Sequence, residues 1–151
     1  MYQNILVPLD GFKESEAVLP MMQDLLGPDG RVLLLHVIPP GRALHAGGRI
    51  LMASEQEEGE RARALAYLRG LARRPGRLPS QWDCEVMVSK RVASAIVDCA
   101  ARENVDLIVM YTHDRKGLAR LLRGSVAETV QQKAAAEVRV VSAGVLAGTP
   151  S

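Results

Sequence analysis

Aromatic residues and cysteines are scarce in this chain, and long apolar runs are absent. Of its 151 residues, 3% are aromatic and two are cysteines, too few for the disulfide framework of a small secreted protein. Cys84 and Cys99 lack the close spacing of a metal-binding pair, so we expect both thiols to be reduced and buried. The apolar run at residues 5–9 is far shorter than the roughly 20 residues that span a bilayer. These shortages predict a cytoplasmic protein without a membrane anchor.

Neither sign of charge dominates the sequence, and familiar catalytic motifs are missing from it. Lys and Arg number 19 against 17 Asp and Glu, which gives a net charge of +2 with both signs spread along the chain. A nucleic-acid partner is therefore not expected. The sequence has no G-x-S-x-G, H-E-x-x-H or P-loop motif, and His36, His45 and His113 lack the spacing of a zinc site. We therefore expect neither a catalytic metal nor an enzyme.

Apolar residues make up 48% of the chain, which is enough for one globular domain with its own core. We place this domain at residues 1–142 and a loose tail at residues 143–151. Five short apolar runs bounded by Gly, Pro or Asp predict buried strands. They cover residues 4–8, 31–38, 82–89, 106–110 and 138–141.

Four segments between these strands have helical periodicity. The first begins at Ser15 and is delayed or kinked by Pro20, whereas the second and fourth open with capping boxes at Ser54 and Ser125. The positions expected to face the core are Val18, Met22 and Leu25 in the first segment, Ala62, Leu65, Leu68 and Ala72 in the second, and Val92, Ala93, Ile96, Val97 and Ala100 in the third.

Residues 41–53 separate the second strand from the second helix. They contain the adjacent glycines Gly47 and Gly48 and no sustained periodicity, so we predict a mobile loop on the surface. The length of this loop makes it a candidate flap.

Strands that alternate with helices predict a doubly wound α/β fold, because parallel neighbours need crossover connections. We expect a five-stranded parallel sheet with helices on both faces. In such sheets a ligand binds beyond the carboxyl ends of the strands, where the strand order reverses. This rule places the candidate site around residues 9–11, 37–38 and 111–125.

Three features of that region have both a chemical and a structural interpretation. Gly124 and Ser125 precede a helix, whose free N–H groups suit a phosphate, but Ser125 is equally suited to cap the helix. Asp10 either accepts a hydrogen bond from a ligand or forms a turn with Gly11. The basic residues before the helix form either a cationic rim for a phosphate tail or a solvated loop, and they are Arg115, Lys116, Arg120 and Arg123.

Two segments of the chain resemble the universal stress protein family. They are the opening run ILVPLDG at residues 5–11 and residues 106–128, which contain DLIVM, TH, GL, RLL and GSVAE. The resemblance covers nearly the whole chain and agrees with the order of elements derived above. It implies an α/β domain like that of the adenine-nucleotide α-hydrolases, and a dimer formed through the last strand.

The resemblance also implies a site for ATP or another adenine nucleotide. Asp10 matches a position that contacts adenine or ribose, Val37 matches one that lines the adenine pocket, and Gly124 with Ser125 retains the phosphate end. The residues that this match assigns to the nucleotide are Pro8, Asp10, Val37, Thr112, His113, Arg115, Gly124, Ser125 and Val126.

The motif that separates ATP-binding members from the others, G-x2-G-x9-G-(S/T), is incomplete here. Its glycine positions fall at Tyr111, Asp114 and Gly124, so the spacing survives while two glycines are lost. We expect Tyr111 to be the worse loss, because a left-handed backbone costs a residue with a Cβ about 1–2 kcal/mol and the ring takes ligand volume. The carboxylate of Asp114 would repel a triphosphate unless Arg115 neutralises it.

Three functions remain open from the sequence. The first is a cytoplasmic regulatory homodimer with a degraded nucleotide site, weak or absent ATP binding and an unidentified protein partner. The second is an ATP-binding stress protein, with or without slow hydrolysis. The third is an enzyme that uses His113 or Asp114 as acid or base.

The dimer contact implied by the resemblance lies in a predicted edge strand, at Val138, Arg139, Val140 and Val141. Unpaired backbone groups on such a strand can pair with a symmetry mate. The alternative is a monomer whose edge is protected by Arg139 and by the shortness of the strand.

Overall fold

The computed structural model describes residues 1–42, 44–46, 49–112 and 126–142. The predicted tail at residues 143–151 lies outside these ranges, and so does Ser125, the first residue of the second predicted capping box. The described elements, in chain order, are β1 (Tyr2–Leu9), the 3-10 helix η1 (Lys13–Met21), α1 (Met22–Leu25), β2 (Leu26–Ile38), β3 (Leu44–Ala46), β4 (Arg49–Leu51), α2 (Ala53–Ala72), the 3-10 helix η2 (Pro79–Gln81), β5 (Trp82–Val88), α3 (Val92–Arg102), β6 (Leu107–Thr112), α4 (Val126–Lys133) and β7 (Glu137–Ser142).

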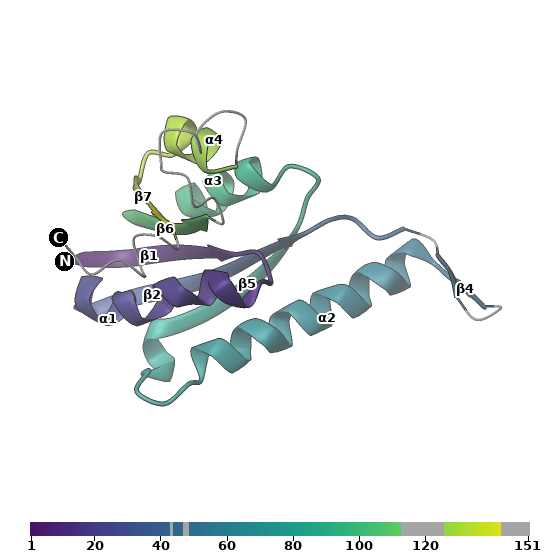
Figure 1. The fold of residues 1–151 in the computed structure, drawn as a ribbon, viewed down its shortest axis with the longest axis horizontal. Helices are drawn as coiled ribbons and strands as arrows, with labels where there is room; N and C mark the ends of the chain where they lie inside the picture. Colours follow the sequence, from purple (N-terminus) through teal and green to yellow (C-terminus); the bar gives the residue numbers. More distant parts are fainter. Residues whose placement is uncertain (43, 47–48, 113–125, 143–151) are drawn as a thin grey trace.

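Five parallel strands form the main sheet, in the order β5-β2-β1-β6-β7, with β1 at its centre (Figure 1). From β1 the chain builds outward through β2 to β5, and then returns to the other side of β1 to add β6 and β7. The strand order therefore reverses between β1 and β6. The predicted five-stranded parallel α/β fold is confirmed.

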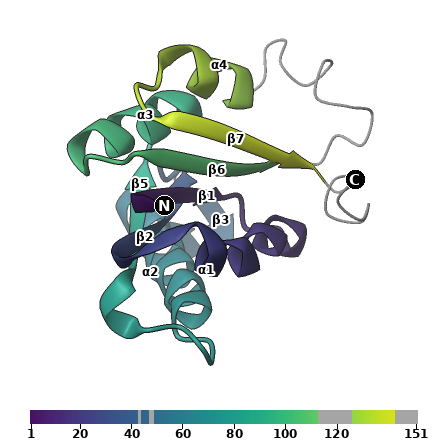
Figure 2. The same cartoon turned by 90° about the vertical axis from the view of Figure 1, so that its left-hand side faces the viewer.

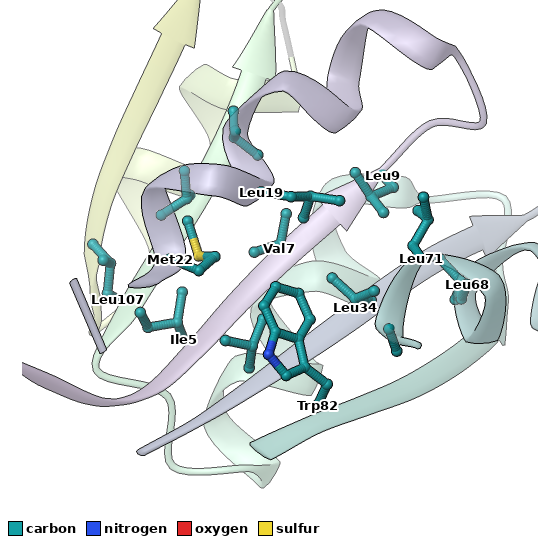
Figure 3. Packing of buried hydrophobic residues seen from close by; sticks show 14 of the residues in the cluster. Ile5, Val7, Leu9, Leu19, Met22, Leu34, Leu68, Leu71, Trp82 and Leu107 are labelled. Carbon is teal, nitrogen blue, oxygen red and sulfur yellow. The ribbon is translucent and has the colours of Figure 1, made fainter. Parts of the chain in front are cut away.

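Two apolar clusters pack on opposite faces of this sheet, because successive side chains of a strand point to opposite sides. In β1, Ile5 and Val7 belong to one cluster and Leu6 to the other. The first cluster joins the sheet to η1, α1 and α2, and Figure 3 shows Leu68 and Trp82 within it. The second joins the sheet to α3 and α4, which lie on the other side of the sheet in Figure 2.

The first predicted helix differs in type from the expectation. Residues Lys13–Met21 form a 3-10 helix that contains Pro20, and only four residues continue it as α1. A proline has no N–H with which to continue an α-helical ladder, which accounts for the short α-helical part. The predicted core positions Val18 and Met22 are buried, whereas Leu25 is partly buried. Strand β2 then begins at Leu26, five residues earlier than expected.

The capping box predicted at Ser54 is wrong. Helix α2 begins at Ala53, with Met52 at its N-cap and no side-chain hydrogen bond there. The polar side chains of the first turns bind the incoming chain instead: the Glu57 carboxylate accepts the Gly41 N–H at 3.0 Å, and the Gln56 side-chain oxygen accepts the Arg42 N–H at 2.9 Å.

The buried face of α2 is turned relative to the predicted one. Leu68 and Ala72 are buried as expected, but Ala62 is exposed and Leu65 is only partly buried. Tyr67 and the buried Ala64 and Leu71 complete the inner face. The larger side chains at Tyr67 and Leu71 gain more from burial than the small Ala62, which explains the rotation.

Within residues 41–53, the prediction of a loop is wrong where the chain forms a hairpin. β3 pairs antiparallel with β4, and Ala53 already belongs to α2. The hairpin projects beyond the start of α2 (Figure 1). The adjacent glycines between the two strands are a recognised signal for a short hairpin turn, and the sequence prediction gave them too little weight.

Strands β5, β6 and β7 lie within two residues of their predicted bounds, and helix α3 contains all the positions predicted for the third helical segment. The buried residues of α3 include the predicted Ile96 and Ala100, together with Ala95 and Cys99. Val92, predicted to face the core, is 39% exposed because it is the first residue of the helix. No helix in the described part of the chain is long and apolar enough to cross a membrane.

The two cysteines lie on opposite faces of the sheet, so they are too far apart in the fold to form a disulfide. Cys99 is buried as predicted, whereas Cys84 is only partly buried. Burial, together with the neighbouring Glu85, raises the pKa of the Cys99 thiol to about 12. Among the described residues, no cluster of three or more His, Cys, Asp or Glu could hold a metal ion.

Candidate functional site: a cavity where the strand order reverses

A cavity of about 250 Å³ lies at the carboxyl ends of β1, β2 and β6, beside the first residues of α3 and α4. This is the point at which the strand order reverses, where ligands of open parallel sheets bind. Its lining is mostly apolar, with four polar side chains among twelve residues: Pro8, Leu9, Asp10, Ser15, Leu35, His36, Val37, Val92, Ile96, Met110, Tyr111 and Val126.

Asp10 forms the turn that its sequence suggested, and it also lies at the cavity. Strand β1 ends at Leu9, and the Asp10 carboxylate then accepts the Phe12 N–H at 2.9 Å, which closes a turn. The same residue lines the cavity. Gly11 makes the turn possible, because its φ of +86° is a conformation that side chains with a Cβ avoid.

We expect Gly11→Ala to lower the free energy of unfolding by about 1–2 kcal/mol, because an alanine would have to adopt the positive φ of Gly11. A Cβ at this position would lie at an ordinary 3.6 Å from His36 Cε1, so the cost comes from the backbone alone. Urea unfolding measures the change. Gly70→Ala, in a helix with nothing near the new Cβ, is the matched control and is expected to add about 0.5–1 kcal/mol. Equal effects at the two positions would contradict this account.

Tyr111 lies in the wall of the cavity, but without the backbone strain predicted for it. Among the described residues that are not glycine, only Asn104 has a positive φ. Tyr111 continues β6 and pairs with Val141, so the strand gives it an ordinary extended backbone. Its partly buried side chain packs against the core cluster beneath η1 and α2. The lost glycine therefore changes the volume of the cavity and not the strain of the chain.

Four of the predicted site residues line the cavity: Pro8, Asp10, Val37 and Val126. Thr112 ends β6, paired with Ser142, and is not part of the lining. The other predicted residues, which are His113, Arg115, Gly124 and Ser125, lie outside the described residues, as does Asp114.

The sequence prediction missed Ser15 and His36 as lining residues. Ser15 is buried and its hydroxyl donates to the Phe12 carbonyl oxygen at 2.7 Å, which ties η1 to the Asp10 turn. His36 was considered as a zinc ligand, which its spacing does not support. Its position directly before Val37, at the carboxyl end of β2, was the signal that could have revealed it.

His36 is partly buried, and within the described structure its Nδ1 atom has no hydrogen-bond partner. Burial lowers the pKa of the imidazole, although the carboxylates of Asp10 and Glu60 act in the opposite direction. As the pH falls, the imidazole therefore takes up its proton later in the folded protein than in the unfolded chain.

Because of His36, we expect the free energy of unfolding to fall as the pH drops below about 6.5. The unfolded chain takes up a proton in that range, while the folded chain resists it until a lower pH. Urea unfolding between about pH 7.5 and about pH 5.5 measures the slope, with His36→Gln as the comparison. A variant with the same slope as the native protein would show that other groups cause the dependence.

Helix η1, which carries Ser15 to the cavity, is fastened to α2 through Glu16. Tyr67 donates to Glu16 at 2.7 Å, and Arg74 pairs with its other carboxylate oxygen at 2.7 Å. Burial alone raises the pKa of Glu16, but these hydrogen bonds outweigh it and the pKa is lowered. A polar contact thus fixes the element that closes one side of the cavity.

A parallel α/β sheet with a cavity at its reversal point defines a class of ligand-binding single-domain proteins. The family model described as "Universal stress protein family" matches residues 1–142. The "Universal stress protein MJ0531" of Methanocaldococcus jannaschii is 32% identical over 147 residues, which covers 93% of this chain and 82% of that protein. The chain therefore belongs to the universal stress protein family.

Solved structures agree with this fold. A universal stress protein in complex with cAMP has a TM-score of 0.65 at 20% identity, over 93% of this chain and 97% of that one. A universal stress protein from Archaeoglobus fulgidus in complex with dAMP has a TM-score of 0.55 at 23% identity, over 92% and 97%. The hypothetical protein MJ0577 has a TM-score of 0.68 at 24% identity, over 94% and 96%. At these identities the likeness concerns the fold.

Proposed function

We propose that this chain is a cytoplasmic regulatory homodimer with an altered adenine-nucleotide site that binds ATP weakly or not at all. The observation that carries the proposal is Tyr111, which stands at a glycine position of the nucleotide motif and lies in the cavity wall. The protein acts through contacts with a partner protein and not through catalysis.

The size and polarity of the cavity support this function. Its volume of about 250 Å³ falls below the roughly 300–1,000 Å³ usual for small-molecule sites. The one carboxylate among its lining residues, Asp10, offers no attraction to phosphates.

The alternative, an ATP-binding stress protein with or without slow hydrolysis, is favoured by a specific observation. Pro8, Asp10 and Val37 lie together in the cavity, where adenine can pack on Val37 and Asp10 can accept a hydrogen bond from the ribose or the base. The other residues that the family resemblance assigns to the nucleotide are Thr112, His113, Arg115, Gly124, Ser125 and Val126, with the phosphate end at Gly124 and Ser125. Because solved structures of universal stress proteins contain cAMP and dAMP, a nucleotide with one phosphate is the ligand to compare with ATP.

The melting temperature in the presence of millimolar ATP distinguishes the two functions. A ligand at 100 times its dissociation constant stabilises the folded state by about 2.7 kcal/mol, so tight binding raises the melting temperature measurably. We expect no shift with ATP. A shift of several degrees at micromolar ATP would support the alternative, and AMP and cAMP in parallel show whether the cavity accepts the base with a shorter tail.

We place the homodimer contact at Val138, Arg139, Val140 and Val141 of β7, which pairs only with β6 in the described sheet. Arg139 donates to the Tyr2 hydroxyl at 2.8 Å and lies 5.3 Å from the centre of its ring. The Arg139 guanidinium is therefore held by Tyr2 of β1 and by Glu137 of β7. We expect a dimer in sedimentation at micromolar concentration, and a folded monomer there would contradict this contact.

A further inference from the structure

A second depression lies between the end of α2 and the amino end of β5, whereas the cavity described above lies at the carboxyl ends of the strands. Figure 1 shows the last turn of α2 beside the first residues of β5. The volume of this depression is about 300 Å³, comparable with that of the cavity, and the two share no lining residue. The depression is lined by Arg69, Ala72, Arg73, Pro79, Trp82, Asp83 and Cys84.

Two arginines of α2 form one wall of this depression. Arg69 and Arg73 are four residues apart, so both side chains lie on the same face at the end of the helix. Within the described part of the chain, neither guanidinium forms a hydrogen bond or an ion pair. The next arginine, Arg74, pairs instead with Glu16 at 2.7 Å. The described chain therefore leaves two positive charges uncompensated at the depression.

The acidic groups of the depression do not neutralise these arginines. Among its described lining residues Asp83 carries the one carboxylate, and this carboxylate is paired with Arg31 of the neighbouring β2. The Cys84 thiol beside it is uncharged at neutral pH, because burial raises its pKa. Arg69 and Arg73 act on this pKa in the opposite direction, so both guanidinium groups lie within electrostatic reach of the thiol. The depression is therefore an electropositive site with a thiol in its lining.

We propose that Arg69 and Arg73 bind a phosphate group in this depression, either as free phosphate or as part of a small phosphate monoester. A guanidinium offers a planar fork of N–H donors that fits two phosphate oxygens. Two forks also match a phosphate monoester in charge, since it carries close to two negative charges at about pH 7, whereas a single carboxylate carries one. The apolar side chains of Ala72, Pro79 and Trp82 complete the lining and suit the uncharged remainder of such a molecule.

This phosphate site does not depend on the function proposed for the cavity, but it bears on the test of that function. A nucleotide that binds at Arg69 and Arg73 through its phosphates would raise the melting temperature without entering the cavity. The double variant Arg69→Gln with Arg73→Gln removes that contribution. A shift with ATP that persists in this variant arises at another site, whereas a shift that disappears in it arises here.

Alkylation of Cys84 by iodoacetamide tests the proposal, because the thiol lies in the same depression. We expect inorganic phosphate, exchanged for chloride at constant ionic strength, to slow this reaction several-fold, since a bound anion covers the thiol and disfavours the thiolate. In Arg69→Gln with Arg73→Gln, the phosphate concentration needed for the same protection is expected to rise by about tenfold or more. Mass spectrometry of the modified peptide separates Cys84 from the buried Cys99, whose pKa is about 12.

A matched variant and two further ligands complete this test. Arg61→Gln with Arg63→Gln removes the same charge from exposed positions of α2 that do not line the depression, and is expected to leave the protection unchanged. Protection by AMP at lower concentration than inorganic phosphate identifies a phosphate monoester as the ligand, and equal concentrations identify free phosphate. The proposal is wrong if phosphate does not slow alkylation of the native protein, if phosphate protects both double variants equally, or if adenosine protects as well as AMP.

Discussion

Replacing Tyr111 by glycine is expected to raise the affinity for ATP by about one to two orders of magnitude. The ring occupies a wall of a cavity of about 250 Å³, and its removal enlarges the space in which we propose that a nucleotide would bind. A gain of about 1.4–2.8 kcal/mol in binding free energy corresponds to this change. Isothermal titration calorimetry measures it, at a temperature where the variant is folded.

Two matched variants show whether the volume of Tyr111 is the cause. Tyr111→Phe keeps the ring and is expected to bind ATP no better than the native protein. Tyr111→Ala removes the ring while keeping the Cβ, and we expect most of the gain seen with glycine. If neither Ala nor Gly improves binding, the block lies elsewhere, with Asp114 as the next residue to change.

Leu68→Ala is expected to lower the free energy of unfolding by about 2–5 kcal/mol. Leu68 is fully buried between α2 and the sheet, where the deleted atoms leave a cavity that the rigid strands cannot fill (Figure 3). Urea unfolding gives the change. Leu78→Ala, at a side chain 60% exposed, is the control and is expected to change stability by less than about 0.5 kcal/mol. A small effect at Leu68 would contradict the assignment of α2 to the core.

The sheet could be predicted because its strands are apolar on both faces and are bounded by Gly, Pro or Asp. The buried face of α2 and the first residue of β2 could not be predicted, because both depend on contacts between residues distant in sequence. Tyr67 turns inward to reach Glu16, and Leu26 extends β2 by pairing with Tyr2. Likewise Gln56 and Glu57 form a plausible cap in the sequence but bind the chain at Arg42 and Gly41.

Part of the candidate site could be predicted from topology and family resemblance. Asp10 and Val37 end neighbouring parallel strands, so their meeting in the cavity follows from the fold. Ser15 could not be found in this way, because the 3-10 turn places it beside the cavity. The strain expected at Tyr111 was also wrong, because the lost motif glycine suggested a turn where β6 continues as a strand.

The most direct test of the altered nucleotide site is mass spectrometry of the small molecules released when freshly purified protein is denatured, followed by calorimetric titration with ATP. The account predicts no stoichiometric ATP in the released fraction and no binding heat at micromolar ATP. One ATP molecule per chain, or saturable binding at micromolar concentration, would contradict it and show that the cavity accommodates ATP despite Tyr111.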